Sequence, residues 1–354
     1  MKVNSLSRLS FQNTLLGCVF LFSIFFILSL WFGSVSLEVR DLLTGIFNTN
    51  IRTQSESILT LIRLPRVLLA AFVGALLSVS GVAMQGLFRN PLADPSLIGV
   101  TAGASAGGSV VIAFSGGLLM GSLGLWLVSL GAFLGGVISV WIVYRLANRS
   151  GAQFNSLNSA ESTSVATMLL AGIAITAMAS SLTSLLEYIV DNNLLRQISL
   201  WKMGGLDGAS WSRVIVIFVV FIVCFFMFPK YATSLNAFLL GESQARYLGV
   251  DVERVKRHLI CLSAAAVGVS VAMAGSISFV GLVVPHMMRL LVGPEHKKLM
   301  ILSAFAGAIL LVVADLVARL IIMPAELPVG LVTAIIGAPF FIYLLTRQSA
   351  FRFN

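Results

Sequence analysis

Two groups of charged residues have the types and spacing that could bind an oppositely charged partner. Arg63 and Arg66 enclose the motif Arg-Leu-Pro-Arg, and Asp315 and Arg319 stand four residues apart, so they share one face of a helix. We expect Arg63, Arg66 and Arg319 to form a cationic rim that could receive an acidic partner. Two alternatives stay open: the arginines could be snorkelling membrane anchors, or Asp315 and Arg319 could form a structural pair.

The longest charged segment, residues 230–257, could carry a docking site. Two short helices are predicted inside it, at 236–240 and 244–248. Gly241 separates them, and Gly249 ends the second one as a C-terminal glycine stop. A protruding pair of short helices suits docking into a groove on another protein. An ordinary solvated loop is the alternative.

A second turn, residues 89–95, contains Pro91 and Pro95. Two prolines forbid a continuous helix and stiffen the backbone. Such an elbow would suit a gate, although a plain turn explains it as well.

Several catalytic and energy-coupling chemistries are excluded or disfavoured. None of the lysines is followed by Ser or Thr, so the Walker A motif for ATP is absent. Residues 103–107 match Gly-x-Ser-x-Gly, but they lie in an apolar run and not at a strand-to-helix turn with a histidine in reach. The long apolar runs carry no acidic residue at their centres, which disfavours ion coupling. A self-sufficient channel or secondary transporter remains the alternative class.

The elements that must position these residues are membrane-spanning helices. Of 354 residues, 58% are hydrophobic and 10% are charged, whereas a soluble domain carries about 25% charged residues. The uncharged runs are mostly long enough to cross about 30 Å of hydrocarbon. We therefore predict an all-α polytopic membrane protein, a single transmembrane domain over residues 1–354 with about ten spans. The predicted spans are 12–33, 64–86, 96–114, 122–145, 164–187, 211–229, 257–275, 278–291, 299–322 and 329–346.

The distribution of charge predicts the orientation. With both termini cytoplasmic, the inward segments hold 15 of the 23 Lys and Arg residues but only 6 of the 14 Asp and Glu residues. This excess satisfies the positive-inside rule. The segment 230–257 then becomes a cytoplasmic loop.

One uncharged run, residues 258–288, has basic flanks on both sides and must therefore enter the membrane and return. Its length of about 46 Å is too short for two crossings. We expect a reversal near Gly275 and Ser276, followed by a short or broken span near 276–291. Irregular backbone at this depth requires protein or a water-filled cavity around it, so this element is expected near a pathway.

Glycines recur four residues apart inside two spans, at Gly103 and Gly107 and at Gly131 and Gly135. We interpret these pairs as sites of close helix packing.

Five motifs together resemble the FecCD-type permeases, a family that imports vitamin B12, ferric siderophores and haem. They extend over about residues 60 to 346 and lie at 63–66, 81–95, 240–249, 279–286 and 326–340. The resemblance implies ten helices per chain in the inner (cytoplasmic) membrane and a homodimer with the pathway at its axis. It also implies two copies of a separate ATPase, which would hold ATP and Mg, and a periplasmic substrate-binding protein. This chain itself would bind no cofactor and no metal.

The resemblance also implies roles for single residues. Asn90 and Leu92 match a cytoplasmic gate, and a second gate would fall near 162–167. Arg63, Arg66 and Arg319 match arginines that dock the binding protein. The residues implied in ATPase coupling are Gly241, Glu242, Ala245, Leu248 and Gly249.

The outer stretch 193–204 and the turn 86–95 are most similar to haem permeases of this family. We therefore expect haem to move from periplasm to cytoplasm by alternating access, with a ferric siderophore or vitamin B12 as alternatives. All three histidines map to cytoplasmic ends, which argues against axial ligation of iron in the pore. Haem would instead slide past apolar and Met surfaces, and Met84 and Gln85 are expected to line the pathway.

Overall fold

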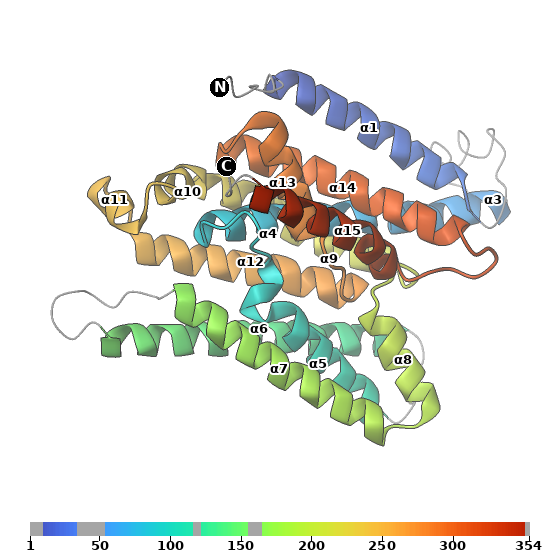
Figure 1. Cartoon of the computed structure of the whole chain (residues 1–354). Helices are drawn as coiled ribbons and strands as arrows, with labels where there is room; N and C mark the ends of the chain where they lie inside the picture. Colours follow the sequence, from blue (N-terminus) through green and yellow to red (C-terminus); the bar gives the residue numbers. More distant parts are fainter. Residues whose placement is uncertain (1–9, 34–53, 116–121, 155–164, 351–354) are drawn as a thin grey trace. The chain divides into compact units, whose positions relative to one another are not determined.

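The computed structural model describes residues 10–33, 54–115, 122–154 and 165–350. Within these ranges the regular structure is entirely helical (Figure 1), as predicted. Seven stretches of helix are long and apolar enough to cross a membrane, and three shorter apolar helices complete the ten predicted spans. The ten are α1 (Phe11–Trp31), α4 (Leu64–Leu87), α5 (Val100–Phe114), α6 (Ser122–Phe154), α7 (Val165–Ile189), α9 (Trp211–Met227), α12 (Val252–Ala274), α13 (Val280–Val292), α14 (His296–Leu320) and α15 (Val329–Ala350).

The largest differences between the helix ends and the predicted spans are at two places. Helical structure begins ten residues before α4, because α3 (Gln54–Ser57) and a six-residue π-helix, η1 (Ile58–Arg63), lead directly into it. Helix α6 continues to Phe154, past the predicted end at 145. Charged residues mark where a span meets water, and a helix can continue beyond that point.

The chain divides into two compact units, each built from separate lengths of sequence. The boundaries fall inside α4 and α9 as well as in loops, so the single-domain assignment stays a prediction. Unit 1 comprises Met1–Val82, Gly205–Phe221 and Ile277–Asn354, and unit 2 comprises Ala83–Gly204 and Ile222–Ser276.

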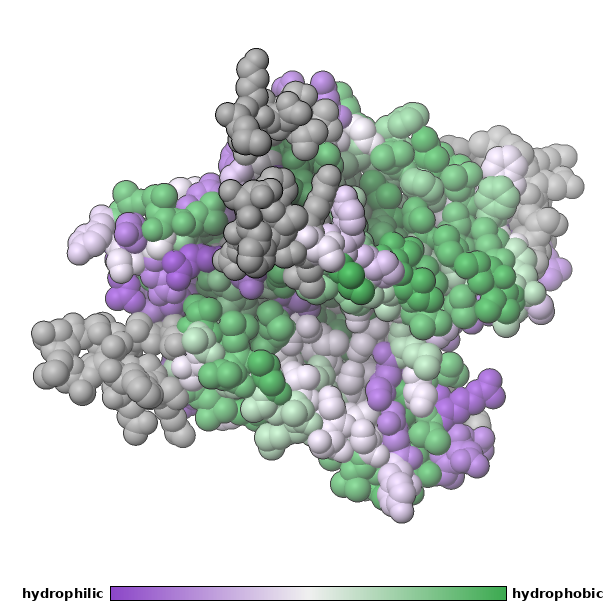
Figure 2. All heavy atoms as spheres, in the orientation of Figure 1, coloured by the Kyte–Doolittle hydropathy of each residue, from purple (hydrophilic) through white to green (hydrophobic). Residues whose placement is uncertain are grey.

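Unit 1 is organised around α14, which packs against α1, α13 and α15. Helix α4 approaches α14 where Gly74 meets Gly307, and it approaches α13 where Gly81 meets Gly281. A Cβ at Gly74 or Gly81 would overlap the facing backbone carbonyl, so only glycine permits this spacing. On the face drawn in Figure 2, hydrophobic atoms cover the region that α1 and α14 occupy, as expected of helices that meet lipid.

Unit 2 is a bundle in which α5 packs against α6, α7 and α12. The glycine pairs predicted to allow close packing do so. A Cβ at Gly107 would overlap the carbonyl of Gly131, and one at Gly135 would overlap the carbonyl of Gly103. The hydrophilic helix α8 (Asn192–Lys202) lies against α5 and α7 and shows as a purple region in Figure 2.

The predicted short span is confirmed, and the helix before it ends at the place where the reversal was predicted. Helix α12 ends at Ala274, and Gly275 follows with φ of 68°, in the left-handed region that glycine tolerates. The chain then enters α13, which has only 13 residues and contains Pro285. The N-cap residue of α13, Phe279, also has a positive φ of 67°.

Candidate functional site

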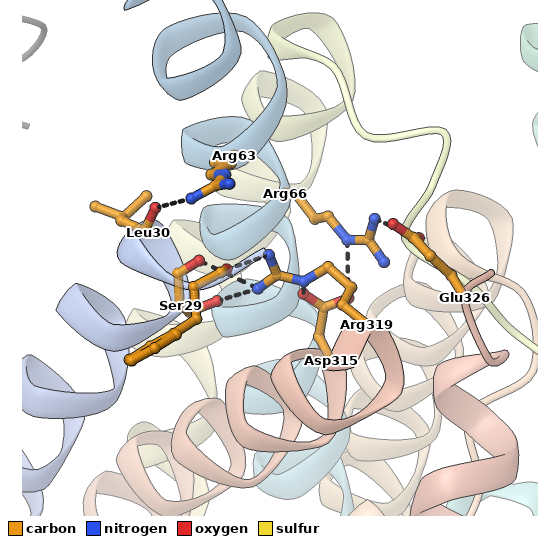
Figure 3. A network of polar contacts seen from close by, with 8 residues as sticks. Ser29, Leu30, Arg63, Arg66, Asp315, Arg319 and Glu326 are labelled. Carbon is orange, nitrogen blue, oxygen red and sulfur yellow. Dashed lines mark hydrogen bonds and ion pairs between the residues drawn. The ribbon is translucent and has the colours of Figure 1, made fainter. Parts of the chain in front are cut away.

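Two of the three arginines predicted at the outer rim, Arg66 and Arg319, meet carboxylates inside unit 1 (Figure 3). Arg66 Nε lies 2.8 Å from Asp315 Oδ1, and Arg66 Nη1 lies 2.8 Å from Glu326 Oε2. Arg319 Nε lies 3.0 Å from the other Asp315 oxygen. Asp315 therefore bridges two guanidinium groups from α4 and α14.

Arg319 and the third arginine, Arg63, hold the C-terminal end of α1. Arg319 donates hydrogen bonds to the backbone oxygens of Ser29 and Phe32 and to the Ser29 hydroxyl. Arg63 donates to the carbonyls of Leu30 and Trp31, at 2.7 Å and 2.6 Å. The last carbonyls of a helix have no partner within it and form the negative end of its dipole. The two guanidinium groups therefore cap α1.

Burial decides between the interpretations of this cluster. Arg63, Arg66 and Arg319 expose 4%, 7% and 5% of their surfaces, and Asp315 exposes none. The Asp315–Arg319 structural pair, one of the alternatives, is present. An open cationic rim is not what these side chains form, so their role in docking a binding protein stays a prediction. Glu326 and the α1 carbonyls were missed because nothing in their spacing indicates these contacts.

The predicted cytoplasmic loop forms two short helices, α10 (Ala232–Phe238) and α11 (Glu242–Tyr247). Gly241 separates them with φ of 113°, and Gly249 follows α11 with φ of 83°. The Ala245 side chain is fully buried, whereas Leu248, just after α11, is 64% exposed.

Ion pairs fix α11 to the start of α12. Lys256 Nζ lies 2.8 Å from Glu242 Oε2, and Arg246 Nη2 lies 3.4 Å from Glu253 Oε1. The Lys256 side chain is almost fully buried, so solvent screens its attraction to Glu242 less than it would screen a surface ion pair. One face of α11 is thereby fastened, and the exposed leucines 240 and 248 remain at its two ends.

The predicted gate residues Asn90 and Leu92 lie in the elbow after α4. The Asn90 side chain accepts a hydrogen bond from the Leu92 N–H at 2.9 Å, which closes a local turn. Asp94 then caps η2 (Pro95–Ile98) by accepting from the Ser96 N–H. Of the second gate predicted near 162–167, residues 162–164 lie outside the described residues and residues 165–167 form the start of α7.

Met84 and Gln85 were predicted to line the pathway, and that role stays a prediction, although both residues are buried within this chain. Their side chains expose 0% and 1%. They pack inside the chain, because α4 is the most deeply buried of the long apolar helices. No solute could reach them without a rearrangement of the surrounding helices.

A groove that the sequence analysis missed runs along unit 2. Its volume is about 430 Å³, within the range of small-molecule sites. Seven of its eleven lining residues carry hydroxyls and one is a lysine. The only available signal was the spacing of hydroxyls on α7. The lining residues are Ser96, Leu97, Thr101, Ala102, Ser105, Ile173, Thr176, Ser180, Thr183, Ser184 and Lys202.

Within the described residues, ten apolar helices, with a short helix pair between α9 and α12, define a multi-pass membrane protein. Comparison with known proteins agrees. The model of the FecCD transport family matches residues 21–347. The hemin transport system permease of Yersinia pestis is 42% identical over 318 residues, which is 89% of this chain and 90% of that protein.

Two further relatives extend the comparison. The Fe(3+) dicitrate transport system permease of Escherichia coli K12 is 39% identical over 91% of this chain and 94% of its own length. A solved structure described as an inward-facing metal-chelate type ABC transporter is 34% identical, with a TM-score of 0.81, and the match covers 95% of this chain and 99% of that one. The chain belongs to the FecCD transport family. It is a multi-pass permease subunit of an ABC importer, a class that works as a dimer with an ATPase and a substrate-binding partner.

Proposed function

We propose that this permease carries haem across the inner membrane, from periplasm to cytoplasm. The observation that carries the proposal is the 42% identity with a hemin permease over nine-tenths of both chains. The similarity of the outer stretch 193–204 to haem permeases points the same way. A ferric chelate is the second candidate, because the ferric dicitrate relative is 39% identical over a similar length.

The mechanism that fits is alternating access driven from outside the chain. Two permease copies would form the pathway, and two ATPase copies would act on the loop 230–257. The geometry of α11 supports this role, because ion pairs to α12 would transmit a pull on α11 into a long membrane helix. The stiff elbow at Asn90 and Leu92 would serve as the cytoplasmic gate.

Uptake by the assembled complex tests the cargo. The permease, its ATPase and its binding protein are reconstituted in liposomes and offered hemin, ferric dicitrate and cobalamin separately. We expect ATP-dependent accumulation of hemin at several times the rate of the other two. Equal or faster uptake of ferric dicitrate or cobalamin would reassign the cargo. Transport by the permease alone, without ATP, would instead indicate a self-sufficient carrier.

We also propose that Arg66 takes part in docking the binding protein. Before docking, Glu326 forms an ion pair with Arg66. Glu326 is 39% exposed, so its removal leaves the buried Asp315 contact in place. We expect Glu326→Gln to tighten binding of the partner by about threefold at low salt, with the gain lost at high salt. Surface plasmon resonance at a series of salt concentrations measures the affinity of the permease for the binding protein.

Glu295→Gln is the matched control, since Glu295 pairs with exposed Lys298 at the predicted cytoplasmic start of α14. It should leave docking unchanged. Identical affinity of the Glu326→Gln variant and the parent at every salt concentration would remove Arg66 from the docking surface.

A further inference from the structure

The groove in unit 2 follows the helix axes and has a single cationic residue in its lining. Its lining on α7 extends from Ile173 to Ser184, a length of about 16 Å at 1.5 Å per residue. At one end lie Ser96 and Leu97 of η2, directly after the elbow. The α8 residue Lys202 contributes the positive charge.

Lys202 is held by a rigid support. Helix α8 buries Leu194 and Ile198 against Ile112 of α5 and Val128 of α6. Trp201, the residue before Lys202, packs its ring so closely on Gly108 that a Cβ there would meet the ring at 2.7 Å. Lys202 also occupies the last turn of α8, where the helix dipole favours a cation. Its backbone position is therefore fixed, while its side chain keeps the flexibility of lysine.

The counter-ion of Lys202 is exchangeable. Lys202 Nζ lies 2.9 Å from Glu187 Oε1, and the two side chains are 37% and 22% exposed. An ion pair of this exposure contributes little net free energy. A carboxylate on a solute in the groove could thus replace Glu187 at small cost.

The rest of the lining offers weak, uncharged contacts. Thr183 already donates its hydroxyl to the carbonyl of Ala179, and Ser105 hydrogen-bonds Ser276 at 2.9 Å. Between the hydroxyls lie apolar residues such as Leu97 and Ile173. Such a surface suits weak binding of a largely apolar solute that carries acidic substituents.

We propose that this groove is a transient subsite for the cargo in which Lys202 binds a carboxylate of the chelate and Glu187 neutralises Lys202 when the groove is empty. The inference rests on the proposed import of a chelate. It adds the chemistry recognised, a free carboxylate, which the propionates of haem and the carboxylates of ferric citrate both supply.

Protection of a reporter thiol tests the subsite. Ser180→Cys places a thiol in the exposed part of the groove, and Cys261→Ser removes the exposed native thiol among the described residues. The purified full-length permease is labelled with a water-soluble maleimide in the presence of protoporphyrin IX, which has both propionates but no iron for the thiol to ligate. We expect protoporphyrin IX to slow labelling and its dimethyl ester, which lacks free carboxylates, to fail at the same concentration.

Variants of the lysine complete the test. Lys202→Gln should raise the half-protecting concentration of protoporphyrin IX about tenfold, as expected for loss of a charge-assisted contact. Lys202→Arg should restore most of the protection. Arg196→Gln, an exposed cation of the same helix outside the groove lining, should have no effect. Equal protection by the ester, or protection indifferent to Lys202→Gln, would overturn the inference.

The thiol-protection experiment and the cargo assay can fail independently of each other. Hemin uptake by the parent complex together with protection indifferent to Lys202 would leave the proposed function standing and remove the subsite. If the parent carries ferric dicitrate and not hemin, citrate must protect the thiol in the same Lys202-dependent way. Failure of citrate to do so would likewise overturn the subsite.

Discussion

Replacing Asp315 with alanine is expected to produce the largest loss of stability of any single substitution in unit 1. Asp315 is fully buried and contacts both Arg66 and Arg319. Without it, Arg319 keeps only neutral acceptors at the end of α1, and Arg66 keeps only Glu326. Removing one partner from a buried ion pair costs about 3–5 kcal/mol, because a buried charge is left uncompensated. The thermal midpoint of the detergent-solubilised permease, followed by size-exclusion chromatography, measures the loss.

Two variants calibrate that result. Asp315→Asn keeps the shape and a hydrogen-bond acceptor but removes the charge, so we expect an intermediate loss. Glu295→Ala breaks the exposed pair with Lys298, which is worth at most about 1 kcal/mol, and should leave the midpoint nearly unchanged. A midpoint of the Asp315→Ala variant equal to that of the parent would show that the buried cluster contributes nothing to stability.

The membrane helices were predictable from the sequence because their cause is simple. A hydrocarbon layer demands a run of about 20 apolar residues, and that demand is visible without knowledge of neighbouring helices. The short α13 was predictable for the same reason, since length and flanking charge left no room for a second full crossing. Helix ends beyond the apolar runs, such as the end of α6 at Phe154, are not set by the length of a span and were placed less well.

Contacts between distant residues were not predictable in the same way. The Asp315–Arg319 pair was visible at a spacing of four, but Arg66 meets Asp315 and Glu326 across 249 and 260 residues of sequence. The backbone carbonyls at the end of α1 that accept from Arg63 and Arg319 leave no signature at all. The rim was therefore expected to be open when its charges are in fact satisfied internally.

The burial of Met84 and Gln85 could not be predicted for a related reason. Met84 and Gln85 have side chains of the types expected to line a transport pathway with weak contacts. Packing of α4 against its neighbours nevertheless buries them. The hydroxyls of α7 that do line a groove look ordinary one by one, because Ser and Thr in membrane helices usually hydrogen-bond their own backbone. Only the facing of α5, α7 and α8 turns them into one surface.

Changes at the two ends of α11 are expected to abolish most transport while leaving the membrane helices intact. Gly241 has a φ of 113°, which side-chain-bearing residues rarely adopt. Gly241→Val would force the backbone between α10 and α11 to a new angle, at a cost of about 1–3 kcal/mol. We expect ATP-driven uptake by the reconstituted complex to fall at least about tenfold, with ATP hydrolysis no longer stimulated by the loaded binding protein.

Leu248→Asp separates contact from conformation, because Leu248 is 64% exposed and its replacement strains no backbone. If the loop docks into the ATPase, this variant should lose uptake together with co-purification of the ATPase, whereas Gly241→Val should retain part of that co-purification. Lys298→Ala, which alters an exposed charge on the predicted cytoplasmic side but outside the loop, is the control and should preserve both. Normal uptake in both loop variants would mean that the ATPase acts on the permease elsewhere, since neither the shape nor the apolar end of α11 would then matter to coupling.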